Sequence, residues 1–111
     1  MGVVSPRRFE VWLVSLDPTR GSEIQKTRPC LVVSPDELNR NLRTVIVAPM
    51  TTVRRNYPTR VSVRFADQAG AAALDQIRTV DRSRLLRRLG SLPQATARQV
   101  CGVLVQMFAW E

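Results

Sequence analysis

Hydrophobic positions fall into short runs separated by turn-forming residues, a pattern typical of a small β-rich domain. Most runs are β-branched, aromatic or apolar on both faces, as buried strands are. Residues 60–65 instead alternate strictly between apolar and polar, which predicts a half-exposed strand with a basic outer face. The predicted strands cover residues 9–16, 30–33, 44–48, 60–65, 74–80 and 85–89. Gly70 and the alanines after it fit neither a strand nor a helix clearly.

Two segments have helical signals. Residues 34–37 read Ser-Pro-Asp-Glu, the spacing of a capping box with proline at the first helical position, and predict a short helix between two strands. Apolar residues recur at helical spacing over 93–108, with Ser91 and Gln94 as a second capping box. The order of elements predicts a mainly β (α+β) fold: a strongly curved antiparallel sheet or partly open barrel with a C-terminal helix. With no repeat or linker, residues 1–111 are expected to form a single domain.

Charge adds a candidate partner. The chain has 17 basic residues against nine acidic ones, a formal net charge of +8 and a pI of about 11.4, and Lys26 is its only lysine. The planar guanidinium matches phosphate oxygens and stacks on bases, so this composition favours nucleic acid, with ordinary solvated arginine as the alternative.

Cysteine and hydropathy suggest the compartment. Cys30 and Cys101 lie far apart in apolar runs, which predicts buried thiols in a reducing environment. No apolar stretch approaches the roughly 18 residues of a membrane span, and no signal peptide is recognisable. A cytoplasmic protein that does not enter the membrane is therefore expected.

The chain contains no histidine, which removes the usual acid and base of ribonucleases and the commonest zinc ligand. The two cysteines are far apart and the carboxylates are scattered, so no metal site is predicted. The sequence also lacks the glycine-rich loop that would bind the phosphates of a cofactor. Any chemistry must use polar residues at strand ends and in loops. These candidates are Ser22, Glu23, Lys26, Thr27, Arg28, Thr51, Thr52, Asp75, Gln76 and Arg78.

Several of these residues lie in ordered sequence blocks that resemble the MazF/PemK/Kid family of toxin–antitoxin ribonucleases. The blocks are residues 11–23 (VWLVSLDPTRGSE), 26–29 (KTRP), 47–52 (VAPMTT), 57–59 (YPT) and 75–81 (DQIRTVD). Their order and spacing extend the similarity over nearly the whole chain. The resemblance implies an SH3-like barrel, a homodimer and a cognate, MazE-like antitoxin as partner.

The resemblance also implies an activity, the metal-independent cleavage of single-stranded RNA such as mRNA at a short sequence. The ribose 2′-OH attacks the adjacent phosphate and leaves 2′,3′-cyclic phosphate and 5′-OH ends. The family's arginine and threonine at the scissile phosphate match Arg28 and Thr51, and a guanidinium and a hydroxyl suit the charge that develops there.

The general base is left between two carboxylates that match family positions, Glu23 and Asp75, of which Glu23 joins Arg28 and Thr51 in the predicted catalytic set. In the Kid branch, the proposed catalytic set has a histidine and an arginine at positions that are Ser22 and Ala73 here, although its aspartate is kept as Asp75. This departure favours a MazF-type mechanism.

RNA contacts are expected from the neighbouring polar residues. Glu23, Asp75 and Gln76 can read base edges, and Arg54 and Arg55 can bind phosphates. A second arginine cluster at 78–88 has three interpretations: more RNA track, a solvated face or an antitoxin surface. The predicted RNA-binding residues are Ser22, Thr52, Arg54, Arg55, Asp75, Gln76 and Arg84.

The last helix bears on assembly, because apolar residues surround much of its circumference, more than one small barrel should cover. These residues are Cys101, Val103, Leu104, Val105, Met107 and Phe108. The pattern predicts a homodimer, with a deeply buried helix in a monomer as the alternative.

Two other functions compete with RNA cleavage. CcdB-type toxins share the barrel and inhibit DNA gyrase without catalysis, using a tryptophan near the C-terminus, which Trp110 could supply. The simpler interpretation is that Trp110 anchors the final helix. A basic barrel that binds nucleic acid without cutting it is the other alternative.

Overall fold

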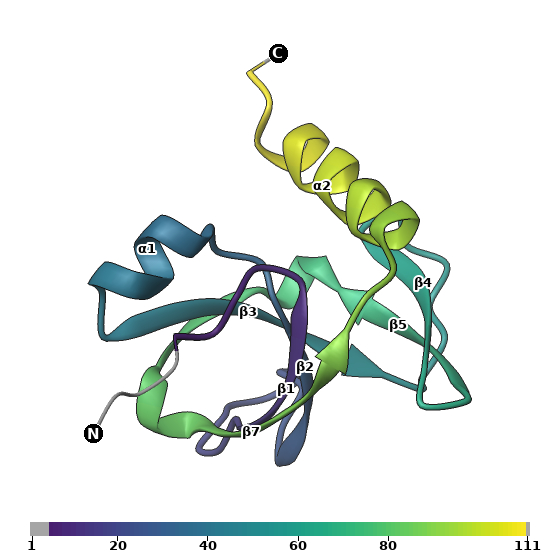
Figure 1. Ribbon diagram of the computed structural model, residues 1–111. Helices are drawn as coiled ribbons and strands as arrows, with labels where there is room; N and C mark the ends of the chain where they lie inside the picture. The colour runs from purple at the N-terminus through teal and green to yellow at the C-terminus, as the bar shows by residue number, and fades with distance from the viewer. Residues whose placement is uncertain (1–4, 111) are drawn as a thin grey trace.

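A curled antiparallel sheet of seven strands, with a long helix at its C-terminal end, forms the body of the computed structural model, which describes residues 5–110 (Figure 1). This confirms the mainly β fold with a C-terminal helix. The strands are β1 (Glu10–Ser15), β2 (Thr27–Val32), β3 (Thr44–Thr51), β4 (Arg60–Phe65), β5 (Gln68–Ala73), β6 (Arg78–Asp81) and β7 (Leu85–Ser91). The helices are α1 (Asp36–Asn41) and α2 (Gln94–Phe108), with 3-10 turns η1 (Leu74–Gln76) and η2 (Arg82–Arg84).

Strand β3 is the centre of the sheet. One edge of it pairs with β2, and the opposite edge pairs with β6 along its first half and with β5 along its end. The turn η1 lies between β5 and β6, where the chain stops following β3 and then resumes. Asp75 and Gln76 occupy this interruption, so the prediction of one continuous strand over 74–80 is wrong. A local hydrophobic run cannot show where a neighbouring strand bends.

Close packing beside β3 explains the small residues that the pattern left unassigned. Gly70 and the three alanines after it form most of β5, and the alanines are buried. A Cβ at Gly70 would lie 2.7 Å from the Thr51 carbonyl oxygen, closer than a real Cβ contact. Glycine therefore allows β5 to approach the end of β3, which extends to Thr51 rather than ending at residue 48.

Both capping-box predictions are wrong. Each helix has a proline at the N-cap, Pro35 or Pro93, and neither has a side-chain cap. The Ser34 hydroxyl donates instead to Asn39 Oδ1 at 2.5 Å and accepts from the Ile46 backbone N–H at 3.0 Å. Ser91 Oγ accepts from Arg88 Nη2 at 3.0 Å. Ser34 thus serves a contact with the neighbouring strand, and Ser91 a local contact within β7.

Helix α2 packs on the sheet by one face only. Ala97 and Val100 are buried, whereas the exposed fractions of Val105 and Phe108 are 67% and 70%. The C-terminal end of α2 stands clear of the strands (Figure 1). Trp110 is 98% exposed, so the prediction that it anchors the helix is wrong. Within residues 5–110, no helix has both the length and the apolar character needed to cross a bilayer.

Candidate functional site

Most of the predicted site residues line one concave surface, here named the polar hollow, of about 470 Å³. It lies between the β1–β2 loop, the loop after β3 and η1. Its lining residues are Ser22, Glu23, Ile24, Gln25, Arg28, Thr51, Val53, Arg55, Tyr57, Arg60, Asp75 and Gln76.

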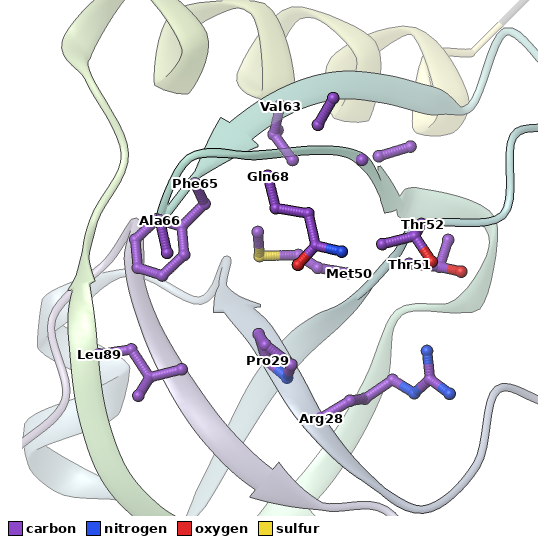
Figure 2. Close-up of a pocket in the computed structure, with 13 residues that line it drawn as sticks. Arg28, Pro29, Met50, Thr51, Thr52, Val63, Phe65, Ala66, Gln68 and Leu89 are labelled. Atoms are coloured by element: carbon purple, nitrogen blue, oxygen red, sulfur yellow. The ribbon is translucent and has the colours of Figure 1, made fainter.

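A second concave surface, the apolar hollow of about 540 Å³, shares Arg28 and Thr51 with the polar hollow (Figure 2). Strands β2 to β5 supply most of its wall, and Arg28 is its only charged residue. The lining residues are Arg28, Pro29, Met50, Thr51, Thr52, Val63, Phe65, Ala66, Gln68, Ala69, Gly70, Ala71 and Leu89. Arg28 and Thr51 thus stand at the boundary between two unlike surfaces.

One hydrogen bond orients the Arg28 side chain and leaves its terminal nitrogens free within the described part of the chain. Its Nε donates to the Gln25 carbonyl oxygen at 2.9 Å, which fixes the guanidinium. Its two terminal nitrogens donate to nothing within residues 5–110. Figure 2 shows the side chain extending from β2 toward the side of the apolar hollow where Thr51 and Thr52 lie. A fork of N–H donors is therefore presented to an incoming anion.

Beneath Arg28 lies Cys30, which is fully buried and donates from Sγ to the Arg28 carbonyl oxygen at 3.6 Å. Burial raises the pKa of the Cys30 thiol to about 12, although the charges of Arg28 and Arg78 oppose the rise. The thiol is consequently protonated and packs as a small hydrophobic group. This confirms the buried thiol predicted for Cys30, whereas Cys101 is only half-buried.

Thr51 is 7% exposed and supplies a second donor. Its Oγ1 accepts from the Val53 backbone N–H at 3.1 Å, which fixes the rotamer and leaves the hydroxyl proton available. Its backbone is fixed by pairing with Ala71 of β5. Together, Arg28 and Thr51 offer fixed donors of the kind that stabilise an oxyanion or a phosphate.

Asp75 accepts hydrogen bonds from Arg60 and Thr59, neither of which was among the predicted site residues. Arg60 donates from Nε to Asp75 Oδ1 at 2.6 Å and from Nη2 to Oδ2 at 3.0 Å, and Thr59 Oγ1 donates to Oδ1 at 3.1 Å. The Arg60 hydrogen bonds hold the pKa of Asp75 below its ordinary value of 3.8, against the opposing effect of burial. The same contact raises the pKa of Arg60. Asp75 is therefore an ionised acceptor.

Arg60 itself was placed by the alternation of 60–65 on an exposed basic face. Its side chain is only 7% exposed, so for this residue the prediction is wrong. Its guanidinium carbon also lies 5.1 Å from the centre of the Tyr57 ring. The signal that could have found it is the block at 57–59, which ends immediately before Arg60.

The β1–β2 loop is fastened over the polar hollow by side chains from elsewhere. Gln76 Oε1 accepts from the Ile24 backbone N–H at 2.7 Å, and Arg78 Nη1 donates to the Leu16 carbonyl at 3.1 Å. Glu23 Oε1 accepts from the Arg20 backbone N–H at 2.5 Å within the loop. These contacts hold Glu23 in the lining of the polar hollow that Arg28 and Thr51 also line.

Three predicted RNA-binding residues lie outside the polar hollow. Thr52 lines the apolar hollow, and Arg54 lines an adjoining surface of about 420 Å³ with Arg55, Tyr57 and Arg60. Arg84 donates to the carbonyls of Ser15 and Asp17 at the base of the β1–β2 loop, contacts that favour a structural role. Within residues 5–110, no three His, Cys, Asp or Glu side chains are grouped as metal ligands would be.

Comparisons with known proteins agree with this arrangement. A family model described as the PemK-like, MazF-like toxin of type II toxin–antitoxin systems matches residues 7–108. The chain is 40% identical over 103 residues to the endoribonuclease PemK of Escherichia coli, covering 87% of this chain and 77% of that protein. It is 36% identical over 105 residues to the endoribonuclease MazF9 of Mycobacterium tuberculosis, covering 85% and 88% of the two chains.

Solved structures show the same fold. The crystal structure of MazF from Deinococcus radiodurans superposes with a TM-score of 0.85 at 25% identity, covering 97% of this chain and 100% of the other. A mycobacterial endoribonuclease in complex with its cognate antitoxin gives a TM-score of 0.80 at 27% identity, covering 96% and 100%. The fold of this chain is therefore shared with these toxins.

Proposed function

The chain belongs to the family of PemK-like and MazF-like toxins of type II toxin–antitoxin systems, and we propose that it is an endoribonuclease that cleaves single-stranded RNA at a short sequence. One observation carries the proposal: Arg28 and Thr51 both line the two hollows, and each keeps a side-chain donor that no residue of 5–110 occupies. Such donors stabilise charge that develops on phosphate oxygens.

The proposed reaction needs no metal. The ribose 2′-OH loses its proton and attacks the adjacent phosphorus, and the bond from phosphorus to O5′ breaks as O5′ takes up a proton. The products are a 2′,3′-cyclic phosphate and a 5′-OH. Arg28 and Thr51 donate to the non-bridging oxygens, and removing one such donor typically costs about 100- to 1,000-fold in rate.

Glu23 is the proposed general base. One of its carboxylate oxygens accepts from Arg20, whereas the other has no hydrogen bond to residues 5–110. Asp75, the alternative, already accepts from Arg60 and Thr59 and is held ionised by them. Within the described residues, Glu23 keeps one carboxylate oxygen free in the lining of the polar hollow, so it is better suited than Asp75 to accept the 2′-OH proton.

Polar residues on both sides of Arg28 support a path for RNA across it. Arg54 and Arg55 lie on the loop after Thr51, where they can bind phosphates, and Ser22, Asp75 and Gln76 can contact base edges. Thr52 reaches the apolar side. Arg84 stays a weaker proposal, because its guanidinium already binds backbone carbonyls.

Two protein partners are part of the proposal. The exposed Val105 and Phe108 on α2 support a homodimer, because monomeric proteins rarely leave a large apolar patch in water. A relative of known structure is in complex with its cognate antitoxin, which supports a MazE-like antitoxin for this chain. Both the RNA substrate and the antitoxin would meet the protein in the cytoplasm. Sedimentation at micromolar concentration should show a dimer, and a stable monomer would contradict it.

RNA cleavage with end mapping tests the function. Incubation with a long RNA in excess EDTA should give fragments with 5′-OH ends at a recurring short sequence. The Arg28→Ala protein, purified identically, controls for contaminating nuclease. Loss of cutting on chelation with recovery in Mg²⁺ would refute metal independence. RNA binding without cleavage, or gyrase inhibition without cleavage, would favour one of the two non-enzymatic alternatives.

A further inference from the structure

The ion pair between Arg60 and Asp75 contains the most enclosed charged group among the ion pairs of residues 5–110, because the Arg60 side chain is 7% exposed. We propose that Arg60 is a positioning residue that fixes Asp75 as the acceptor for one N–H of an RNA base, so that Asp75 selects bases and takes no part in proton transfer. This inference rests on the proposed ribonuclease function.

The backbone around the pair is tied together on both sides. Arg60 lies opposite Ala73 in the β4–β5 ladder, and the Leu74 N–H donates to the Thr59 carbonyl at 3.0 Å. The Arg60 N–H in turn donates to the Tyr57 carbonyl at 3.0 Å. The guanidinium and the carboxylate are thus mounted on one rigid hairpin and the turn that follows it. This ladder fixes the backbone positions from which the two side chains reach each other.

Counting acceptor positions shows what Asp75 has left to offer. A carboxylate accepts about four hydrogen bonds, two at each oxygen. Arg60 and Thr59 occupy three, two on Oδ1 and one on Oδ2. The side chain is still 31% exposed and lines the polar hollow. Among residues 5–110, Oδ2 thus accepts from one side-chain donor only, and the exposed part of the carboxylate faces a ligand in the hollow.

A single fixed anionic acceptor selects between bases by whether the base edge presents a hydrogen-bond donor or an acceptor. It pairs with a base edge that presents an N–H, such as the exocyclic amino group of adenine or cytosine. A carbonyl edge at the same place would set two acceptors against each other, which leaves buried groups unpaired and is penalised. We expect one charge-assisted hydrogen bond of this kind to discriminate about tenfold between the two kinds of edge.

Tyr57 extends the proposed base site. Its ring is half exposed, stands against the Arg60 guanidinium and lines the same hollow as Asp75. Aromatic rings of this kind are surfaces on which unpaired RNA bases stack. Arg60 consequently contacts both groups that would hold the base, one on its face and one at its edge.

Arg60 also explains why Asp75 is unsuited to proton transfer. Accepting a proton would cost the carboxylate its charge and with it the two-point contact to a guanidinium that has no other anion within residues 5–110. The lowered pKa of Asp75 agrees with this geometry. An acceptor that stays ionised throughout the working pH range can read a base without titrating.

The test separates base selection from catalysis by using randomised 2′-fluoro RNA, which lacks the attacking 2′-OH. Bound sequences are compared for the wild type, Asp75→Asn, Arg60→Gln and Thr59→Val, with Arg64→Gln as the matched control. Arg64 is an exposed arginine on the same strand and lines neither hollow. Preference at one base position should fall about tenfold in Asp75→Asn and Arg60→Gln and less in Thr59→Val, and should not change in Arg64→Gln.

The second readout is the pH profile of cleavage, measured on natural RNA. Asp75→Asn should retain the acidic limb of the wild-type profile and cut a broader set of sequences. A uniform loss of binding at all base positions, or loss of the acidic limb, would overturn the inference. If Arg60→Gln does not fold by circular dichroism, Thr59→Val still provides the test. If the wild type selects sequences but cuts no RNA, the proposed function fails and the base-selection inference does not.

Discussion

The two hollows share Arg28 and Thr51 but are built from different parts of the fold. Strands supply most of the apolar hollow, and its wall is made of groups such as Met50, Val63 and Phe65. Loops and the η1 turn supply most of the polar hollow, which holds every carboxylate in the lining of the two. In this barrel, regular strands set the shape and carry Arg28 and Thr51, while irregular segments supply the polar groups that we propose distinguish one ligand from another.

The difference also has an electrostatic meaning. An apolar surface beside Arg28 and Thr51 offers water few partners, so a ligand that covers it would place their donors in a medium of lower dielectric constant than bulk water. The opposite side is hydrated and charged. We expect changes at the shared pair to affect catalysis, changes on the polar side to affect loop position and base choice, and distant polar changes on the apolar side to have little effect.

The largest effect is expected at Arg28. Arg28→Ala should lower the single-turnover cleavage rate about 100- to 1,000-fold and weaken RNA binding far less, because its unused donors act on charge that forms in the transition state. Arg28→Lys should fail as well, since an ammonium lacks the planar fork. Arg54→Ala should mainly weaken binding and lower its salt dependence. Equal proportional losses of cleavage and binding in Arg28→Ala and Arg54→Ala would show that Arg28 is only an electrostatic tether.

The next prediction tests whether the close packing of β5 on Thr51 matters for stability and cleavage. Gly70→Ala places a methyl group 2.7 Å from the Thr51 carbonyl, so β5 or Thr51 must move. We expect about 1–3 kcal/mol lower free energy of unfolding, the usual cost of overpacking, together with slower cleavage. Gly102→Ala is the control, because nothing lies within 4 Å of its added Cβ and alanine favours a helix. Unchanged stability in Gly70→Ala would mean that the strands separate easily there.

A matched pair of glutamines compares the two hollows directly. Gln76→Ala removes the acceptor that holds the Ile24 N–H at 2.7 Å, so the β1–β2 loop should loosen, at a cost of about 1 kcal/mol and a several-fold loss of activity. Gln68→Ala, on the apolar side, should change neither, because Gln68 makes no side-chain hydrogen bond within residues 5–110. Hydrogen exchange at Ile24 and cleavage assays measure both. Equal losses of activity and of protection at Ile24 in the two variants would show that the two hollows do not differ in this role.

The smallest expected effect is on the pH dependence of stability. Since Arg60 lowers the pKa of Asp75, the carboxylate stabilises the fold fully above its unfolded value of 3.8 and loses that contribution as pH falls through the lower folded value. The stability difference between the wild type and Asp75→Asn should therefore be largest above pH 3.8 and shrink below it. Thermal unfolding from pH 2 to 7 measures this. A difference that is constant with pH would mean that the ion pair adds nothing to stability.

Local patterns in the sequence predicted much of the fold, because they depend on properties that neighbouring residues share. The apolar runs located most strands, and the helical spacing at 93–108 located α2. The failures share a cause. Each failure depends on what lies opposite a residue in space. The examples are the bend at η1, the packing of β5 on Thr51 and the contact of Ser34 with Ile46. A pattern along the chain does not contain that information.

The candidate site divides in the same way. Ordered sequence blocks were sufficient to single out Arg28, Thr51 and Asp75, and charge alone pointed to a polyanionic partner. The tertiary structure decided how Asp75 is used, because its partner Arg60 comes from β4, through a register that sets Arg60 opposite Ala73, two residues before Asp75. A carboxylate's charge state and free acceptor positions depend on which donors surround it, and those donors meet only when the hairpin forms. Sequence thus named the groups, and folding determined which of them remain free to bind.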